Sequence, residues 1–407
     1  MGSKMKALVL GIGLQGKAVV HDLDKSSLIT EIVAADTELA EAERYLMRSD
    51  VKKAKAAVFD ASDENQLKRI ISETNPDVVI CMLPASFGYA TAKAAIAAGK
   101  PFVSTSYTGQ IAELAEKAKQ KEIAVLPEMG LDPGIDLILG KMAIEALDEI
   151  HGLYSYGSGV PEPPCADDNP LKYKITWTFD GVLLSYKRPA RLLKDGKTIS
   201  IAPEDIFKKE NLHMVDIPDL GRMEAYPNGD AISFIKAFGL NHRVTHMGRF
   251  AMRWPGHCDF WRIMSTMGFL DDQPVLIDGI EVSPFKFVSA HLSPYLQYQK
   301  NERDVVILRI HAWGLKHGRQ TNVIYDLVDY RDLETGFFAM NRTVGFTASI
   351  AAQMLLDGTI TETGILSPIR HVPSLPFIDE LKKRNIEIIQ RVNGNSSSDD
   401  TGQEAPK

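Results

Sequence analysis

Short apolar runs alternate with amphipathic stretches along the first third of the chain. The runs have the length of buried strands, and the stretches between them, such as ASFGYATAKAAIAAG, repeat apolar residues at helical spacing. Strands joined by helices of this length predict an α/β domain with a parallel, doubly wound sheet over residues 5–131. The strand patterns are KALVLGIG, EIVAADT, AAVFDAS, DVVICMLP, PFVSTSY and IAVLPEMG.

The pattern changes near Tyr154, where longer segments alternate β-branched or aromatic residues with polar ones. Three segments are typical of long strands: YKITWTFDGVLLSY, and DVVILRIHAWG paired with QTNVIYDLVDY. Residues 132–341 are therefore expected to form a second α+β domain with a mixed sheet. Residues 342–392 start with a helix pattern rich in small residues, RTVGFTASIAAQMLLDG. We expect these C-terminal helices to pack back on the first domain, and residues 393–407 to form a disordered tail.

Composition narrows the class of partner. The 407 residues carry a formal charge of −7, and the basic residues are spread along the chain, which argues against nucleic acid and favours a small-molecule substrate. The three cysteines are widely spaced, there is no secretion signal, and no apolar run is long enough to span a bilayer. A cytoplasmic protein with no membrane contact is expected. No GxSxG or Walker motif supports a hydrolase or a kinase.

A glycine motif follows the first predicted strand. Gly11, Gly13 and Gly16, with Leu14 among them, open a helix in the GxGxxG arrangement that lets a pyrophosphate approach a helix N-terminus. Asp36 lies twenty residues after Gly16, at the end of the second strand pattern, where a carboxylate accepts hydrogen bonds from an adenosine ribose. The sequence therefore predicts a Rossmann-type dinucleotide site. NAD is favoured because Asp36 repels a 2′-phosphate, although NADP stays open.

Two further strand patterns end in residues suited to the nicotinamide half of the cofactor. In open parallel sheets, ligands bind at the carboxyl ends of the strands. We expect these residues to face the nicotinamide: Leu83, Pro84, Thr105, Ser106 and Tyr107.

PEMGLDPGID, residues 127–136, follows the sixth strand pattern and leads into a helix. One interpretation makes Asp132 the N-cap of that helix, with Pro133 at its first position. The other makes Asp132 a functional carboxylate at the ligand-binding edge.

GRFAMRWPGHC contains two arginines four residues apart. Arg249 and Arg253 suit bidentate carboxylate binding, but a solvated arginine pair is equally consistent with the pattern. His257 and Cys258 beside them lack a second pair at metal-ligand spacing, so a structural role is favoured and no metal is expected.

The chain resembles the saccharopine dehydrogenase family from about Lys6 to Pro368. The resemblance rests on EMGLDPGID, DNPLKYKITW followed by GVLL, YPNGD, RFAMRWPGH, NERDVVIL and TVGFTASIAAQMLLDG. It implies a homodimer that uses a nicotinamide cofactor to oxidise or form a C–N bond of an amino acid. Cofactor contacts implied by the resemblance are Gly11, Gly13, Asp36, Asp60, Leu83, Ser106, Leu131 and Thr178, and we add Gly16, Leu14, Pro84 and Asp132. Implied substrate contacts are Ser106, Tyr107, Asp132 and Arg253, and we add Arg249.

The chemistry suggests catalytic roles for two of these residues. An alkylammonium group must lose a proton before its carbon releases hydride, so Asp132 is expected to bind the cation and pass on the proton while Tyr107 holds the nitrogen.

One position departs from the family. Glutamate-forming saccharopine dehydrogenases read PNRD where this chain reads PNGD, so the arginine that would bind a substrate carboxylate is replaced by Gly229. Three substrates stay open: saccharopine, lysine (favoured by the similarity of RWPGHC and IDGIEVSP to lysine 6-dehydrogenases) and a carboxy-polyamine. A catalytically idle binding or scaffold protein is the alternative of a different class.

Overall fold

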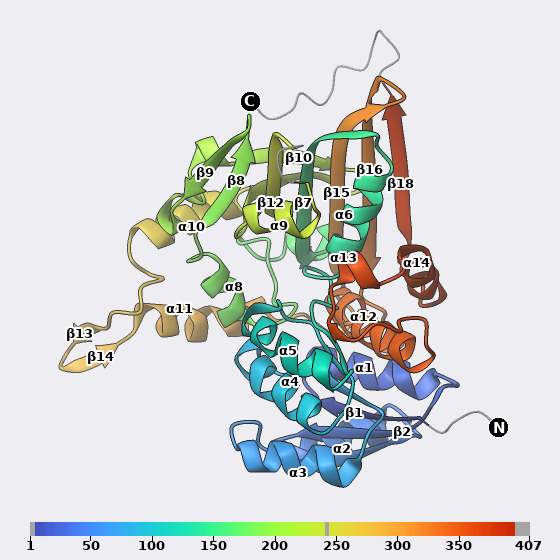
Figure 1. The fold of residues 1–407 in the computed structure, drawn as a ribbon. Coiled ribbons are helices and arrows are strands. Elements are labelled where there is room, and N and C mark those ends of the chain that lie inside the picture. The colour runs from blue at the N-terminus through green and yellow to red at the C-terminus, as the bar shows by residue number, and fades with distance from the viewer. Residues whose placement is uncertain (1–4, 241–243, 395–407) are drawn as a thin grey trace. The chain divides into compact units, whose positions relative to one another are not determined.

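The computed structural model describes residues 5–240 and 244–394, and these divide into two compact units (Figure 1). Unit 1 comprises residues up to Leu139 together with Glu334–Glu387, and unit 2 comprises Gly140–Leu333 and the residues from Ile388. Of the predicted disordered tail, residues 395–407 lie outside the described residues, whereas Asn393 and Gly394 belong to a strand. No helix in the described ranges is long and apolar enough to cross a bilayer.

Unit 1 is built on a parallel sheet of seven described strands in the order β17-β6-β5-β4-β1-β2-β3. The order reverses between β1 and β4, as in doubly wound nucleotide-binding folds. The strands are β1 (Met5–Leu10), β2 (Ile29–Asp36), β3 (Ala54–Val58), β4 (Val78–Cys81), β5 (Phe102–Ser104), β6 (Ala124–Leu126) and β17 (Gly364–Ile365). The helices are α1 (Leu14–Lys25), α2 (Leu39–Arg48), α3 (Glu64–Thr74), α4 (Gly88–Ala97), α5 (Ala115–Gln120), α12 (Ala339–Leu356), α13 (Pro368–His371) and α14 (Ser374–Lys383). The predicted α/β fold is confirmed.

The composition of the central strands explains their position. Every residue of β4 is buried, and so are the last four of β1, because helices cover both faces of a parallel sheet. Apolar runs without alternation therefore form the middle of the sheet. A core of apolar side chains includes Leu8, Val79 and Phe102.

Unit 2 is built on a mixed sheet in the order β10-β11-β12-β7-β15-β16-β18, with β8 paired to β12 and β9 paired to β8. β12 runs parallel to β7 and the other pairs are antiparallel, so the predicted mixed sheet is confirmed. The strands are β7 (Glu149–Pro161), β8 (Ala190–Lys194), β9 (Lys197–Ile201), β10 (His213–Ile217), β11 (Gly221–Pro227), β12 (His246–Arg253), β15 (Asp304–Lys316), β16 (Arg319–Tyr330) and β18 (Ile388–Gly394). A separate hairpin consists of β13 (Val275–Ile277) and β14 (Ile280–Val282).

Short helices complete unit 2, and one helix leads into it. They are α7 (Pro163–Ala166), α8 (Phe179–Ser185), α9 (Ile232–Ala237), α10 (His257–Thr266) and α11 (Pro284–Leu292). The strand expected over residues 173–186 is wrong, because α8 forms there and buries Phe179, Val182 and Leu183 at helical spacing. α6 (Ile135–Glu145) crosses the boundary between the units. The segment expected to consist of C-terminal helices ends differently, because its last residues form β18 and pair with β16 instead of forming a helix.

The C-terminal part of unit 1 returns to α1, as predicted. α12 packs against α1 at Gly345, where a Cβ atom would lie only 2.7 Å from the Cβ of Ala18 and 2.7 Å from the carbonyl oxygen of Gln15. The small residues of this helix pattern therefore allow a close approach between two helix backbones.

A buried ion pair stabilises the contact between α1 and the C-terminal part of unit 1. The guanidinium of Arg384 donates from Nε to Oδ1 of Asp22 at 2.7 Å and from Nη2 to Oδ2 at 2.9 Å, and the Ser349 hydroxyl donates to the same carboxylate at 2.6 Å. Asp22 lies on α1, Ser349 lies on α12, and Arg384 follows α14. One carboxylate thus joins segments from the two ends of the chain.

We predict that Arg384→Ala lowers the free energy of unfolding of unit 1 by about 3 kcal/mol, because it leaves the buried Asp22 carboxylate without its cation. The measurement is the urea concentration at the unfolding midpoint, compared between variants that have the same dependence of unfolding free energy on urea concentration. Lys383→Ala is the matched control, since that side chain is 68 % exposed and should change the stability by less than about 0.5 kcal/mol. Equal midpoints for the two variants would contradict a stabilising role for the pair.

Candidate active site

The glycine loop of unit 1 has the geometry that a pyrophosphate needs. Gly11 adopts φ +93°, and a Cβ on Gly16 would lie 1.9 Å from the carbonyl oxygen of Gly11, so neither position accepts a side chain without distortion. At Gly13, the N-cap of α1, a Cβ would meet no atom within 4 Å, and no side chain caps the helix. The N–H groups at the start of α1 are therefore available to a phosphate, and the loop fits a dinucleotide. Leu14 begins α1 and is 45 % exposed.

Asp36 ends β2 beside this loop. Its Oδ2 accepts the backbone N–H of Ile12 at 2.6 Å, and its Oδ1 accepts that of Glu38 at 3.3 Å. The carboxylate is thereby oriented at the carboxyl edge of the sheet, where the sequence predicted a ribose contact.

Other predicted cofactor residues follow neighbouring strands at the same edge. Asp60 lies just after β3, and hydrogen bonds from the Ser62 hydroxyl and backbone N–H keep the pKa of Asp60 below its usual value. Leu83 is half-buried and Pro84 is exposed after β4, and Thr105, Ser106 and Tyr107 follow β5. The structure thus places these residues along one edge of the sheet of unit 1, where parallel strands bring their carboxyl ends together.

The turn at residues 130–135 differs from the predicted helix cap. α6 begins at Ile135, not at Pro133, so the N-cap role expected for Asp132 is wrong. The peptide between Asp132 and Pro133 is cis, and the N–H groups of Ile135 and Asp136 donate to the carbonyls of Gly130 and Leu131. Because the turn satisfies the first N–H groups of the helix with its own carbonyls, the Asp132 carboxylate is not used as a cap. Leu131 is buried within this turn.

The Asp132 carboxylate lies next to Tyr107. The Tyr107 hydroxyl donates to Oδ1 of Asp132 at 3.4 Å, and the Tyr107 residue is 43 % exposed. A carboxylate and a phenol thus meet at the edge of the nucleotide sheet, as the sequence-based hypothesis requires.

Glu128 holds the two loops that carry this pair. Its Oε1 accepts the Thr108 backbone N–H at 3.0 Å and the Thr108 hydroxyl at 2.9 Å. Two backbone bonds run beside it, from the N–H of Glu128 to the carbonyl of Ser106 and from that of Met129 to Ser104. Tyr107 and Asp132 are therefore fixed relative to one another by Glu128 and by a short ladder of main-chain bonds.

Asp136 is the third carboxylate of this segment. It is buried, and its Oδ1 accepts the N–H of Gly134 at 2.7 Å. Burial raises the pKa of Asp136 to about 7, against the hydrogen bonds from Gly134 and Leu137 that favour the anion. This carboxyl group thus braces the turn after Asp132 from the interior.

Unit 2 carries a second group of predicted residues on β12. The Arg253 guanidinium is buried and lies 5.4 Å from the ring centre of Tyr173 and 5.8 Å from that of Tyr226. Nη1 donates to the Met252 carbonyl at 2.8 Å, but Nε has no hydrogen-bond partner among the described residues, and no carboxylate of those residues forms an ion pair with Arg253. A buried cation between aromatic rings, with no carboxylate partner in the described part of the chain, is suited to bind an anionic ligand.

Arg249 lies four residues before Arg253 on the same strand. It is also buried, and its guanidinium carbon lies 4.4 Å from the ring centre of Phe234. The interpretation of Arg249 and Arg253 as a solvated pair is therefore wrong, because the strand is central in its sheet and both side chains are covered.

His257 and Thr178 belong to the same unit. The Nε2 of His257 lies 2.8 Å from the Tyr186 hydroxyl, and its pKa is lowered by burial and by the nearby Arg253 cation, so the imidazole is neutral near pH 7. The hydrogen bond to Tyr186 and the burial of His257 agree with the structural role favoured for this residue from the sequence. Thr178 is the N-cap of α8.

Two of the sequence signatures contact each other next to Tyr173. Lys174 of DNPLKYKITW donates to Glu302 of NERDVVIL at 2.6 Å, and both side chains are largely buried. The Asn169 amide donates to the Tyr173 carbonyl at 3.0 Å. These contacts fix the loop that presents the Tyr173 ring to Arg253.

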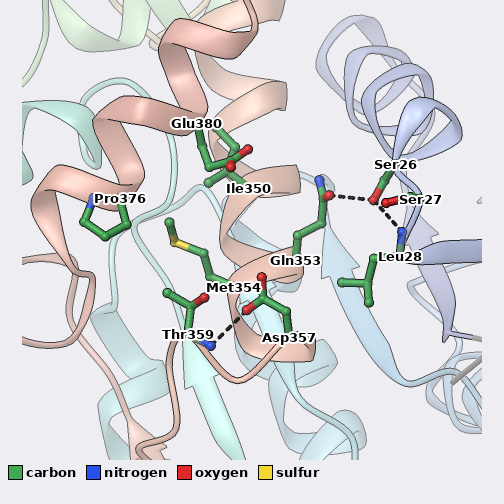
Figure 2. A pocket seen from close by; sticks show the side chains of 10 residues that line it. All are labelled: Ser26, Ser27, Leu28, Ile350, Gln353, Met354, Asp357, Thr359, Pro376 and Glu380. Atoms are coloured by element: carbon green, nitrogen blue, oxygen red, sulfur yellow. Dashed lines mark hydrogen bonds between the residues drawn. The ribbon is translucent and has the colours of Figure 1, made fainter. Parts of the chain in front are cut away.

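A cavity of about 360 Å³ in unit 1 lies away from the glycine loop (Figure 2). Ser26, the C-cap of α1, donates to the Gln353 amide oxygen there at 2.6 Å. Because Gly13 lies at the opposite end of α1, this cavity is not the dinucleotide site. Its lining consists of Ser26, Ser27, Leu28, Ile350, Gln353, Met354, Asp357, Thr359, Pro376 and Glu380.

Family comparison agrees with both units. Residues 7–126 match the family described as the saccharopine dehydrogenase NADP binding domain, and residues 130–386 match the saccharopine dehydrogenase C-terminal domain. The chain belongs to the saccharopine dehydrogenase family. It is a saccharopine dehydrogenase homologue, an NAD(P)-dependent oxidoreductase of the class that acts on CH–NH groups.

Individual relatives have low sequence identity to this chain, but they align with most of its length. The NADP(+)-dependent, L-glutamate-forming saccharopine dehydrogenase of Saccharomyces cerevisiae is 28% identical, covering 93% of this chain and 96% of its own length. A crystal structure of saccharopine dehydrogenase (L-Glu forming) from that yeast matches with a TM-score of 0.84 and 26% identity, covering 96% of this chain and 100% of that one. The mitochondrial α-aminoadipic semialdehyde synthase of Bos taurus is also 28% identical over 95% of this chain, which spans only 48% of the bovine protein. Carboxynorspermidine synthase of Vibrio cholerae is 23% identical over 93% of this chain and 94% of its own.

Sequence reasoning missed the residues that support the candidate site. Glu128, Asp136, Tyr173 and Tyr226 all lie within or beside the quoted motifs, but nothing in their spacing shows that they hold the loops or surround Arg253. One available signal was the number of carboxylates in residues 127–136, which exceeds what a turn needs.

We predict that Glu128→Ala lowers kcat/KM about 10- to 100-fold, because the Tyr107 and Asp132 loops lose the contact that aligns them. Glu128→Gln keeps the acceptor oxygen and should restore most of the activity. Glu122→Ala is the matched control, since Glu122 and Glu128 both adopt positive φ (+55° and +65°) and share any backbone strain of the substitution. If Glu122→Ala and Glu128→Ala lose activity equally, the effect is strain and not positioning.

Proposed function

We propose that this protein catalyses the NAD(P)-linked oxidation of a secondary amine of saccharopine type, or the reverse reductive step. The contact between the Tyr107 hydroxyl and the Asp132 carboxylate, beside an intact dinucleotide loop, is the observation that carries the proposal. The yeast relative is named a saccharopine dehydrogenase that forms L-glutamate, which supports the same substrate class.

Each residue has a separate task in this reaction. A nicotinamide cofactor, whose pyrophosphate would be held by the glycine loop, would supply a hydride acceptor or donor for the substrate carbon when bound. Asp132 binds the ammonium form of the substrate and takes its proton, which an amine with a pKa near about 10.4 retains at neutral pH. Tyr107, whose O–H donates to Asp132, accepts the remaining N–H of the substrate nitrogen and leaves the nitrogen lone pair free to form the C=N bond. The resulting imine adds water, and the C–N bond then breaks to give a carbonyl compound and an amine.

Ser106, Arg253 and Arg249 are assigned to the rest of the substrate. Arg253 takes a carboxylate, because the guanidinium is buried without an ion-pair partner among the described residues and its Nε is unsatisfied. Arg249 is assigned a second polar contact on the same strand. The cofactor contacts expected from the sequence, Thr178 included, remain part of this proposal.

A carboxy-polyamine is the second candidate substrate. Gly229 stands where the glutamate-forming enzymes have an arginine, and a side chain there would meet no atom within 4 Å. A substrate with one carboxylate fewer and a long cationic tail fits this open, uncharged position. The Vibrio cholerae relative, a carboxynorspermidine synthase, supports this candidate. Lysine is a third candidate on sequence similarity alone.

We predict turnover of saccharopine, or of aminoadipate semialdehyde with glutamate in reverse, above that of lysine and of aspartate semialdehyde with a diamine. Absorbance of the reduced nicotinamide is the readout, with both cofactors and all three substrate sets. Asp132→Asn should lower kcat by about 10²- to 10⁴-fold without changing the unfolding midpoint. Glu113→Gln, an exposed carboxylate in the same unit, is the control and should be neutral.

Several outcomes separate the candidates. A higher kcat/KM for the diamine-derived imine selects the carboxy-polyamine. Cofactor binding with no turnover of any substrate favours the idle binding protein, and an unfolding midpoint lowered as much as kcat would make Asp132 structural.

We propose NAD as the preferred cofactor. The Asp36 carboxylate, which accepts the Ile12 N–H at the end of β2, repels a 2′-phosphate at the position where the ribose is expected. The yeast relative is named for NADP(+), so the preference is a property to be tested on this chain.

Asp36→Ala should reduce the ratio of kcat/KM with NAD to kcat/KM with NADP by about tenfold or more, because it removes both the ribose contact and the repulsion. Asp36→Asn separates these effects, since an amide oxygen still accepts the Ile12 N–H that orders the loop. An unchanged ratio in both variants would remove Asp36 from cofactor selection.

A homodimer and a cytoplasmic location, both expected from the sequence, complete the proposal as predictions.

A further inference from the structure

Behind Arg253 lie two polar side chains to which the proposed reaction gives no task. Tyr186 is the C-cap of α8, His257 is the first residue of α10, and Arg253 is the last residue of β12. The three residues are 1%, 2% and 8% exposed. The ends of three elements thus bring a phenol, an imidazole and a guanidinium together in the interior of unit 2.

The carboxylate nearest to Arg253 in the sheet is bound elsewhere. Glu224 on β11 is the cross-strand partner of Arg253, so both side chains leave the same face of the sheet. Glu224 nevertheless accepts the N–H of Gly256 through Oε1 at 2.9 Å and the N–H of Cys258 through Oε2 at 3.1 Å. Both oxygens therefore hold the start of α10, the segment that carries His257.

The hydrogen bonds of His257 have one consistent direction. Nδ1 lies 3.4 Å from the Leu171 carbonyl oxygen, which can only accept, so Nδ1 carries the proton. Burial and the Arg253 cation lower the pKa of His257, so the ring is neutral and Nε2 has no proton. Nε2 therefore accepts the Tyr186 O–H at 2.8 Å. Tyr186 has then donated its single proton, and its oxygen is left as an acceptor.

The Tyr186 oxygen is next to the Arg253 guanidinium. Burial raises the pKa of Tyr186, and the Arg253 cation lowers it through its charge and through a hydrogen bond between the two side chains. Because a guanidinium only donates, this hydrogen bond uses the acceptor that His257 leaves on Tyr186. Nη1 of Arg253 donates to the Met252 carbonyl at 2.8 Å, and Nε has no partner among the described residues. The guanidinium is thus held on one side while Nε stays available to a ligand.

We propose that Tyr186 and His257 are positioning residues. A hydrogen-bonded chain from the Leu171 carbonyl through His257 and Tyr186 holds the Arg253 guanidinium in the orientation that binds a substrate carboxylate. Without this chain the guanidinium gains rotational freedom, and part of the binding free energy is used to order it. The proposal rests on the proposed function and deepens it, because both residues act on substrate recognition through Arg253.

Removing one hydroxyl tests the pair in the whole enzyme. Tyr186→Phe keeps the ring, which packs against Phe207 and Trp261 with ring centres 5.1 and 5.2 Å apart. KM for saccharopine should rise about tenfold, while kcat and the KM for the cofactor stay within about twofold. Tyr156→Phe is the matched control and should leave KM unchanged. Tyr156 is a second buried tyrosine of unit 2, and its hydroxyl lies 3.1 Å from the Nε2 of His213.

Two variants of His257 separate positioning from packing. His257→Gln keeps an acceptor for the Tyr186 O–H and should hold KM within about threefold of the wild type, whereas His257→Leu should raise KM about tenfold. Combining Tyr186→Phe with His257→Leu should be no worse than His257→Leu alone, because both changes break the same chain. Independent packing defects would multiply instead.

Two measurements do not depend on turnover. Isothermal titration with glutamate should give a dissociation constant about tenfold higher for Tyr186→Phe than for the wild type. The same change should not affect 1,4-diaminobutane, which has no carboxylate. Nitrogen NMR of histidine-labelled protein, assigned with His257→Gln, should show a protonated Nδ1 and an unprotonated Nε2 in His257. If these results hold and no substrate is turned over, the positioning pair stands and the proposed function alone fails.

Four results would each overturn the proposal. They are a protonated Nε2 in His257, a KM for Tyr186→Phe no higher than that for Tyr156→Phe, multiplying effects in the double variant, and a glutamate affinity that is unmeasurable in the wild type or unchanged by Tyr186→Phe.

Discussion

The common direction of the strands in the sheet of unit 1 decides which residues can meet. Because β1 to β6 run parallel, their carboxyl ends share one edge, and any polar residue that follows a strand is placed there. Gly11, Asp36, Leu83, Tyr107 and Asp132 come from five strand ends far apart in the sequence. The chemistry of the protein thus depends first on strand direction, and only then on the identity of each side chain.

Residues 127–136 show how one short segment uses three carboxylates in three environments. Glu128 is held between loops by two bonds from Thr108, Asp132 lies beside the exposed Tyr107, and Asp136 is buried beneath the turn. Burial favours the neutral form of Asp136, whereas Asp132 lies beside the Tyr107 hydroxyl, where the proposed mechanism has it accept a proton. These differences in environment distinguish Glu128 and Asp136, which support the loops, from Asp132, the carboxylate to which the proposed mechanism assigns the proton transfer.

Much of this organisation could be predicted from sequence because it rests on local periodicity. Unbroken apolar runs indicated parallel strands, alternation indicated the mixed sheet, and small residues in 342–358 indicated the close packing that Gly345 makes with Ala18. Aspects set by contacts between distant segments were not predictable. The N-cap role predicted for Asp132 was wrong because the carbonyls of Gly130 and Leu131 accept the first N–H groups of α6. No pattern in the sequence indicates these hydrogen bonds. Burial of Arg249 and Arg253 likewise depends on the neighbouring strands of β12, and the Glu128 contact depends on a loop twenty residues away.

The charges of unit 2 restrict the substrate more than the fold does. A buried guanidinium without a counter-ion is costly, and within the described ranges no carboxylate pairs with Arg253, which lies near the rings of Tyr173 and Tyr226 and donates to the Met252 carbonyl. A ligand carboxylate would offset it, and the affinity gained is then specific to an anion. At Gly229 the opposite holds: φ is +75°, and the position contributes neither charge nor side chain to a loop whose Asn228 N–H donates to the Arg249 carbonyl. The Asp230 beside it is already paired with Arg191. In the proposed site, Arg253 is the position that recognises a ligand carboxylate, whereas Gly229 adds no charge of its own to the selection between saccharopine and a carboxy-polyamine.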